Sequence, residues 1–497
     1  MKQIGKAGVS AAKWSVATTI ARFGLQLIAQ VILARALGPE IYGLFGMGMV
    51  VFTLSNFFAT FGFSYGLHQL KEIDDSDIRV AFTWQLLTGI AAGGAMFLAA
   101  PWTAQYFHDD RVQFITQWMA LACVINSLGS VPGNLMRRSM SFRISGLIQL
   151  ASYFLGYIGV GVPLALMGAG VSALVAAWMT QATVGWLASY YVVRHPIRLL
   201  FKSTHSPELL RMGMAVFFTN LGNWFISTLD RLMIGRYLNA HAMGVYTVGN
   251  NLANMPNTLL IGAMQPVFMA AGARVQDEPE RLKLAYQQVS STIWVVLFPF
   301  FVMLAFLSPE IVRLLYGPAW IEAVPVLQIL FVSMPAFVTW GMSTPVLWNT
   351  GRAKFEIFLQ LPLLPLAAVA YYLFGRNSIE HATLVAAAVI GARGLVMATA
   401  ASKILSVRPT QWVVWMVRGA LLTAVTLLLP WICLRVYAPP MPAIVALFVG
   451  GALGFGTLGA FVIAFPIVLG RDAAMLLLRF FPRLRPRFTK TFPAAPT

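Results

Sequence analysis

The sequence predicts an all-α polytopic membrane protein with about 14 transmembrane helices, and three observations support this. The 497 residues are 58% hydrophobic and only 10% charged. Soluble domains typically carry about 25% charged residues. The apolar residues also fall into runs of about 20, the length that a helix needs to cross a bilayer. Because of this composition, the usual relation between chain length and number of soluble domains does not apply.

Charged residues, glycines and prolines divide the chain into fourteen apolar runs, which we interpret as transmembrane spans. The predicted spans are residues 14–35, 43–66, 80–101, 114–136, 144–166, 169–192, 213–236, 244–271, 287–307, 324–348, 356–374, 381–402, 411–434 and 442–469. No cleavable signal peptide is expected, because the first residues lead into a span without a small-residue cleavage site. An even number of spans places both termini on one side.

The distribution of lysine and arginine predicts on which side of the membrane the termini lie. In this layout 25 of the 35 basic residues lie on the side of the termini, six on the opposite side and four inside spans. By the positive-inside rule, both termini are expected to be cytoplasmic. The net charge of +18 therefore reflects membrane topology. We expect no nucleic-acid partner, because the basic residues lie at helix ends instead of forming one patch.

An internal repeat predicts the domain organisation. Residues 33–48 align with residues 234–249, and the identical pairs are Arg35/Arg236, Leu37/Leu238, Gly43/Gly244 and Gly48/Gly249. The copies lie six spans apart, and an even number of crossings makes such repeats parallel. We therefore expect two parallel six-helix lobes followed by a two-helix C-terminal appendix. The predicted boundaries are 1–205 and 206–405 for the lobes, 406–470 for the extra helices and 471–497 for a basic cytoplasmic tail.

Each repeat contains a short turn between its two spans. In the first copy Gly38 and Pro39 precede Glu40, a sequence typical of a tight turn that begins a new helix. In the second copy the turn is expected around Asn239. We assign no chemistry to either turn.

Polar side chains recur at helical spacing inside several spans. Arg22, Gln26 and Gln30 follow one another at intervals of four, so they share one face of the first span. Similar sets are Asn220, Asn223, Asp230 and Arg231 in the seventh span, and Asn250 and Asn254 in the eighth. Such residues line a substrate path in some membrane proteins and bond neighbouring helices in others. The pattern alone leaves both interpretations open.

Charges inside the spans are more specific, because a charged side chain at that depth costs a few kcal/mol unless it meets water, a partner or a ligand. Arg22 has no neighbouring acid in its span, which favours a position on a polar cavity. Asp230 and Arg231 point about 100° apart on a helix, so pairing with other helices is the simpler interpretation. Arg393 is expected to reach either the headgroup boundary or a lobe interior.

Four motifs follow one another along the chain: ILARALGPEIYGLFG near the N-terminus, MRRSMSFR, the run DRLMIGRYLNAHAMGVYTVGNNLANMPN, and LLYGPAW at 314–320. Together they resemble the Wzx-type polysaccharide transporters of the multidrug/oligosaccharidyl-lipid/polysaccharide exporter superfamily. The likeness covers roughly residues 10–405 in family order and is strongest to exporters of the colanic acid or xanthan type.

This resemblance implies a flippase that moves an undecaprenyl-diphosphate-linked oligosaccharide from the cytoplasmic to the periplasmic leaflet by alternating access. Its location would be the bacterial inner membrane, and its product would enter exopolysaccharide or lipopolysaccharide synthesis. Coupling to a proton or sodium ion is implied instead of ATP hydrolysis, and the sequence contains no phosphate-binding G-x-x-x-x-G-K-[ST] loop. Membrane lipids and a polysaccharide polymerase or export machinery are the further partners implied.

Within that function, Arg22 is the first candidate for binding the diphosphate or an acidic sugar, and Asp230 for ion coupling. The remaining candidates for the substrate path are Gln26, Gln30, Asn220, Asn223, Arg231, Asn250, Asn254 and Arg393. No catalytic residue, metal ligand or cofactor is expected.

Three alternatives stay open at this point. One is an ion-coupled multidrug or metabolite antiporter of the same superfamily, although a cation-rich interior disfavours cationic drugs. Another is a flippase for lipid-linked peptidoglycan precursors. The third is a membrane polymerase or ligase, which would need a larger extramembrane loop and an acid–base pair that the sequence lacks.

Overall fold

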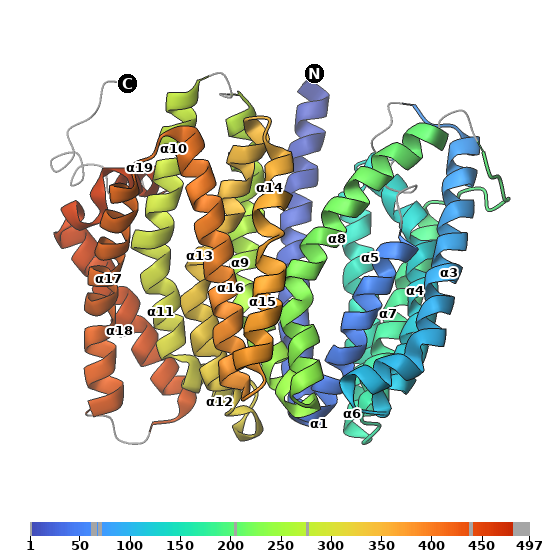
Figure 1. Cartoon of the computed structure of the whole chain (residues 1–497), viewed down its shortest axis with the longest axis horizontal. Helices are drawn as coiled ribbons and strands as arrows, with labels where there is room; N and C mark the ends of the chain where they lie inside the picture. The colour runs from blue at the N-terminus through green and yellow to red at the C-terminus, as the bar shows by residue number, and fades with distance from the viewer. Residues whose placement is uncertain are drawn as a thin grey trace. The chain divides into compact units, whose positions relative to one another are not determined.

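The computed structural model describes residues 2–60, 67, 72–202, 206–274, 278–436 and 441–480. Its described residues divide into two compact units, residues 1–247 and residues 248–497. Every regular element in them is helical, which confirms the all-α prediction. Figure 1 shows the helices coloured along the chain.

The first unit consists of long helices that pack around α4. Its elements are α1 (Lys2–Ala59), α3 (Asp75–Phe107), α4 (Arg111–Arg138), α5 (Phe142–Tyr153), the π-helical η1 (Phe154–Gly161), α6 (Val162–Leu166), α7 (Val171–Val192) and α8 (Ser206–Tyr237). Helix α4 contacts α1, α3 and α7, and α8 packs on α1 and α3. A capping box begins α3, because the Asp74 carboxylate accepts a bond from the Asp77 backbone while Asp77 reciprocates.

Helix α1 covers the first predicted span and the second as far as Ala59, and a single non-helical residue, Gly38, lies between the two. Gly38 adopts φ 75° and ψ 174°, a conformation that favours glycine, and Pro39 starts the following helix. The Glu40 carboxylate then forms an ion pair of 2.7 Å with Arg111 at the start of α4. The predicted turn is confirmed.

The second unit begins within α9 (Ala240–Arg274), which continues from the first unit. Its further elements are α10 (Pro279–Thr292), η2 (Ile293–Leu297), α11 (Phe298–Phe306), α12 (Ser308–Leu315), η3 (Pro318–Trp320), α13 (Ala323–Asn349), α14 (Ala353–Gln360), α15 (Leu363–Ala370), η4 (Tyr371–Gly375), α16 (Ile379–Leu405), α17 (Pro409–Trp431), η5 (Ile432–Val436), α18 (Ala443–Ala464), η6 (Pro466–Leu469) and α19 (Gly470–Phe480). Helix α13 packs between α11 and α16 (Figure 1).

The helices agree with the predicted spans. Eleven stretches of the described residues are long and apolar enough to cross a membrane, and one of them, Ala17–Ala59, contains two predicted spans. Helices α8 and α9, of 32 and 35 residues, coincide with the predicted spans 213–236 and 244–271. Four predicted spans contain or end in a π-helical segment, and these segments are residues 154–161, 293–297, 371–375 and 432–436.

Small residues bring the two predicted extra helices, α17 and α18, against the rest of the second unit. A Cβ atom on Gly419 of α17 would overlap the Trp294 carbonyl, and one on Gly454 of α18 would stand 2.6 Å from the Met303 side chain. Close approach through glycine is typical of helix packing in membranes. The following helix, α19, buries Ala473 and Ala474 in the core of the same unit, so this part of the predicted tail is packed.

The two copies of the repeat touch through equivalent residues within the first unit. A Cβ atom on Gly43 would meet the Ala240 carbonyl group, and one on Gly244 would meet that of Pro39. Pro39 and Ala240 are themselves equivalent in the repeat. Each copy therefore presents the same surface to the other, as at a two-fold interface between identical subunits.

Candidate functional site

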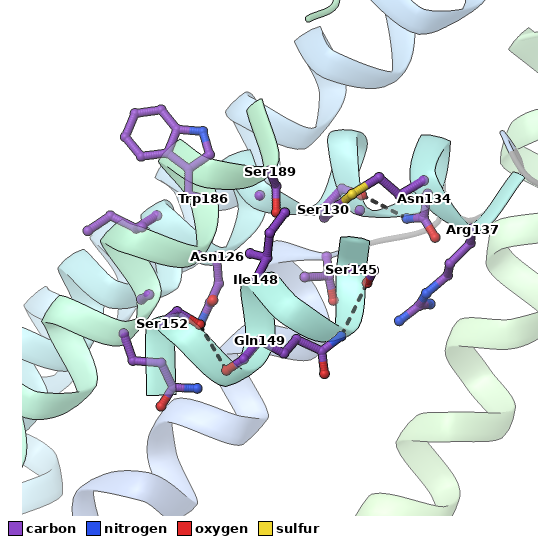
Figure 2. Close-up of a pocket in the computed structure, with 18 of the residues that line it drawn as sticks. Asn126, Ser130, Asn134, Arg137, Ser145, Ile148, Gln149, Ser152, Trp186 and Ser189 are labelled. Atoms are coloured by element: carbon purple, nitrogen blue, oxygen red, sulfur yellow. Dashed lines mark hydrogen bonds between the residues drawn. The ribbon is translucent and has the colours of Figure 1, made fainter. Parts of the chain in front are cut away.

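The first unit contains a polar cavity of about 490 Å³. Its walls come mainly from α4, α5 and α7 (Figure 2), and Phe57 of α1 and Phe217 of α8 also line it. The polar lining residues are Asn126, Ser130, Asn134, Arg137, Ser145, Gln149, Ser152, Gln181 and Ser189. This volume lies in the range of about 300–1,000 Å³ that small-molecule sites occupy.

Helical spacing explains how these side chains converge. Asn126, Ser130 and Asn134 follow at intervals of four along α4, so all three face the same way. Ser145 and Gln149 show the same interval on α5, where the Gln149 amide donates to the Ser145 hydroxyl at 3.3 Å. Three helices thus each turn one polar face to a common space.

Two oxygen atoms of the cavity are buried without a hydrogen-bond donor within the described part of the protein. They are Oδ1 of Asn134 and Oε1 of Gln181. The Asn134 amide itself donates to the Ser130 carbonyl at 3.0 Å. A buried acceptor without a donor costs about 1–3 kcal/mol, so a ligand with hydroxyl groups would gain by entering.

Arg22 does not line this cavity but bonds to Gln149 of α5, which does. Its Nη1 donates to Oε1 of Gln149 at 2.6 Å, and its Nε is buried without a partner in the described residues. One turn earlier Thr18 packs against Gly146 of the same helix. The start of the predicted polar stripe therefore faces α5, and the guanidinium of Arg22 is adjacent to a residue that lines the cavity.

The side chain of Asp230 connects α8 to α9. Its carboxylate accepts a hydrogen bond of 2.5 Å from the hydroxyl of Tyr246 on α9 and another from the backbone N–H of Arg231. The Nε of Arg231 is buried without a partner in the described residues. Asp230 thus joins the two helices that flank the turn around Asn239.

The remaining amide candidates do not gather in the cavity. Asn254 donates to the carbonyl and side-chain oxygens of Asn250 within α9, at 2.9 and 2.8 Å. Gln26 and Gln30 continue along α1, and Nε2 of Gln30 has no partner among the described residues. Asn223 lies half-buried on α8. The side chain of Asn220 lies outside the described residues.

Arg393 lies in the interior of the second unit, where it is 5% exposed. Its Nε donates to Gln360 at 2.9 Å, and its guanidinium lies 4.2 Å from the centre of the Trp340 ring. The Gln360 amide continues the chain of bonds to Glu356, which also accepts from Trp348. The headgroup alternative is therefore excluded for Arg393.

The sequence contained signals for the residues that we did not predict. The cavity residues of α4, α5 and α7 show the same interval of four that identified Arg22, Gln26 and Gln30. The predicted span 356–374 begins at Glu356, so the sequence places this acid at a span end, whereas the structure buries it to 6% exposure.

Residues 32–325 match the protein family described as "Polysaccharide biosynthesis protein". This region is more than half of the 497-residue chain. The chain belongs to the polysaccharide biosynthesis protein family. The family assignment agrees with the resemblance that the sequence motifs indicate.

Relatives in this family come from several bacteria. The chain is 26% identical to the lipopolysaccharide biosynthesis protein WzxC of Escherichia coli (strain K12), over 65% of this chain and 66% of WzxC. It is 25% identical to the succinoglycan biosynthesis transport protein ExoT of Rhizobium meliloti (strain 1021), over 68% of each chain. The teichuronic acid biosynthesis protein TuaB of Bacillus subtilis (strain 168) is 21% identical, over 75% of this chain and 77% of TuaB. The match spans just under two thirds of WzxC.

Solved structures share the fold of this family member. The lipid II flippase MurJ, in an inward closed conformation, aligns with a TM-score of 0.73 at 13% identity, over 91% of this chain and 99% of MurJ. An inward-facing MATE family transporter of the MOP superfamily aligns with a TM-score of 0.62 at 14% identity, over 77% of this chain and 94% of the transporter. The fold is thus MurJ- and MATE-like, as the predicted superfamily requires.

Proposed function

We propose that the protein moves polyprenyl-diphosphate-linked oligosaccharides across the membrane, from the cytoplasmic to the periplasmic leaflet, for polysaccharide biosynthesis. The observation that carries this proposal is the polar cavity inside a membrane-spanning unit, in a chain of the polysaccharide biosynthesis family. The relatives are named as polysaccharide biosynthesis and transport proteins, and MurJ is named as a lipid II flippase. The protein acts as a transporter and catalyses no covalent step.

The physical problem of this transport is the transfer of a polar headgroup through about 30 Å of hydrocarbon. Each unpaired hydroxyl would cost several kcal/mol there, and an unpaired diphosphate far more. The cavity offers amides and hydroxyls for sugar hydroxyl groups, and the buried acceptors of Asn134 and Gln181 need donors that sugars supply. Arg22 and Arg137 supply positive charge for the phosphates.

The orientation and energy source form the finer part of the proposal. The positive-inside rule supports cytoplasmic termini, and the bacterial relatives support a location in the inner membrane. The cavity residues Ser145, Ser189 and Arg137 lie near helix ends that this topology assigns to the cytoplasmic side. Asp230, bound to Tyr246, is the candidate for coupling to a proton or sodium ion. A polysaccharide polymerase is the expected downstream partner.

The test is a leaflet-resolved analysis of lipid-linked oligosaccharides in cells depleted of the protein. We expect complete units to accumulate on the cytoplasmic leaflet, because their headgroups lose their route across the bilayer. The wild type should restore export, whereas Arg22→Ala and Gln149→Leu at normal expression should not. The matched control is Arg313→Ala, which removes an exposed cation of α12 outside the cavity.

Two results would contradict the proposal. Complete units that reach the periplasmic leaflet but remain unpolymerised would indicate a polymerase. No change in either leaflet would indicate another cargo, and drug or metabolite export would then be tested. Full activity of Arg22→Ala would remove that residue from the substrate path, and full activity of Asp230→Asn would remove the coupling role.

A further inference from the structure

A second cavity of about 800 Å³ lies beside the polar one within the first unit. It is formed by α1, α3 and α8, and most of its lining is aliphatic or aromatic. Three of the four hydroxyl groups that line it are already engaged, since Thr88 donates to Ala59, Thr103 to Ala100 and Tyr106 to Leu232; the fourth is that of Ser55. These three hydroxyls are therefore already bonded to the protein, and the cavity offers mainly apolar contact to an occupant.

An aromatic partition separates the two cavities. Phe217 of α8 lines both of them, whereas Phe57 lines the polar cavity and Phe58 the apolar one. The rings of Phe58 and Phe217 pack edge to face at 5.4 Å between centroids, and those of Phe57 and Trp224 at 6.4 Å. A hydrogen bond of 3.1 Å from Trp224 to Thr53 fixes the last ring.

This arrangement selects an amphiphile. A sugar diphosphate alone would leave the apolar cavity unused, and a hydrocarbon alone would leave the buried acceptors of Asn134 and Gln181 without donors. Only a molecule with a polar head joined directly to a long apolar chain covers both surfaces at once. The aromatic partition would then lie at the junction between head and chain, where amphipathic rings are favoured.

We propose that the first unit binds its cargo in two parts, with the polyprenyl chain in the apolar cavity and the diphosphate head in the polar cavity. The inference rests on the proposed function and adds a binding site for the lipid chain to it. Phe58 and Phe217 are positioning residues that hold the junction of the two parts. Flanking α3 residues Ala91, Ala95 and Ala99 leave the space that the chain occupies.

The test measures binding of undecaprenyl diphosphate to the purified full-length protein by native mass spectrometry. Ala95→Trp fills the apolar cavity from an exposed position of α3, so it should weaken binding at least tenfold. The matched control is Leu98→Trp, because Leu98 is 73% exposed on the same helix and lines neither cavity. Inorganic diphosphate, which has no chain, should bind both variants as it binds the wild type.

A second variant guards against a folding defect. Ala95→Leu adds less volume, so it should weaken undecaprenyl diphosphate less than Ala95→Trp while melting at the wild-type temperature. Equal binding by the wild type and Ala95→Trp would overturn the proposal. The proposal would also be overturned if phosphatidylglycerol displaced undecaprenyl diphosphate as well as undecaprenyl diphosphate itself does, since ordinary membrane lipid would then be the occupant.

The chain site and the proposed function would fail in different ways. If the chain site is wrong but the function right, Ala95→Trp will support normal export in the depleted cells. If the function itself is wrong, wild type will neither bind undecaprenyl diphosphate nor restore export, and the chain site falls with it.

Discussion

The close contact between Gly43 and Gly244 predicts a loss of stability on substitution, and its magnitude follows from the interatomic distances. A Cβ atom on Gly43 would stand 2.8 Å from the Gly244 nitrogen, and one on Gly244 would stand 2.9 Å from the Gly43 nitrogen. Heavy atoms in favourable contact are about 3.5–4.0 Å apart. A Cβ atom on Gly43 would also overlap the Ala240 carbonyl oxygen, and one on Gly244 that of Pro39, so an alanine at either position must push α1 and α9 apart by more than about 1 Å. Overpacking costs about 1–3 kcal/mol, and because the obstacle is backbone, which cannot rotate away, we expect about 3 kcal/mol.

Thermal unfolding of the detergent-solubilised protein, followed by tryptophan fluorescence, measures this cost. Gly43→Ala and Gly244→Ala should each lower the melting temperature by several degrees and by similar amounts. The matched control is Gly24→Ala in α1, since a Cβ atom there has nothing within 4 Å. That substitution should be neutral or stabilise the helix by about 0.5–1 kcal/mol.

The double variant distinguishes a single contact shared by both glycines from two independent contacts. One separation of the helices relieves both clashes, so Gly43→Ala with Gly244→Ala should cost less than the sum of the single variants. Full additivity would refute a common contact. If Gly43→Ala and Gly244→Ala melted at the same temperature as Gly24→Ala, the close approach of the two helices would be refuted.

Three further predictions concern buried polar groups. Arg393→Lys should lower the melting temperature, because lysine cannot keep the bond to Gln360 and the stacking on Trp340 together. Arg435→Gln should destabilise the protein by roughly 1–3 kcal/mol, because it leaves the buried Glu310 carboxylate without its 2.8 Å ion pair, and adding Glu310→Gln should restore most of the loss. Burial lowers the pKa of His195 from its usual 6.5, so the neutral ring stabilises the fold above about pH 6.5 and this contribution is lost as the pH falls. Melting curves between pH 7.5 and 5 should therefore shift less for His195→Gln than for the wild type.

Most of the fold was predictable because each span obeys a local rule. An apolar run long enough to cross a bilayer becomes a helix wherever it lies, so the helices of the described residues are compatible with the predicted runs. The turn residues were equally readable. Gly38 takes the left-handed conformation, and the side chain of Asn239 caps α9 by accepting a bond from the Ala242 backbone at 2.8 Å.

The candidate site was harder to predict, since it depends on which helical faces converge. Arg22 reaches the polar cavity only through Gln149, a residue 127 positions away. Asn250 and Asn254 show the same spacing as the cavity residues, yet they bond each other within one helix. Periodicity identifies a polar face, whereas packing decides what that face meets. The polar contacts of Arg393 come from α13 and α14, so no reading of α16 alone could choose between its two expected positions.

The reciprocal contact of Gly43 with Ala240 and of Gly244 with Pro39 also bears on ancestry. A contact in which each side presents the same residue needs only one gene, because two copies of a single-repeat chain could pair through it. Fusion of the two genes would preserve the crossing while freeing the surfaces around it to diverge. The glycines are then constrained as a pair, whereas the polar faces of α4, α5 and α7 are free to diverge with the ligand of the polar cavity.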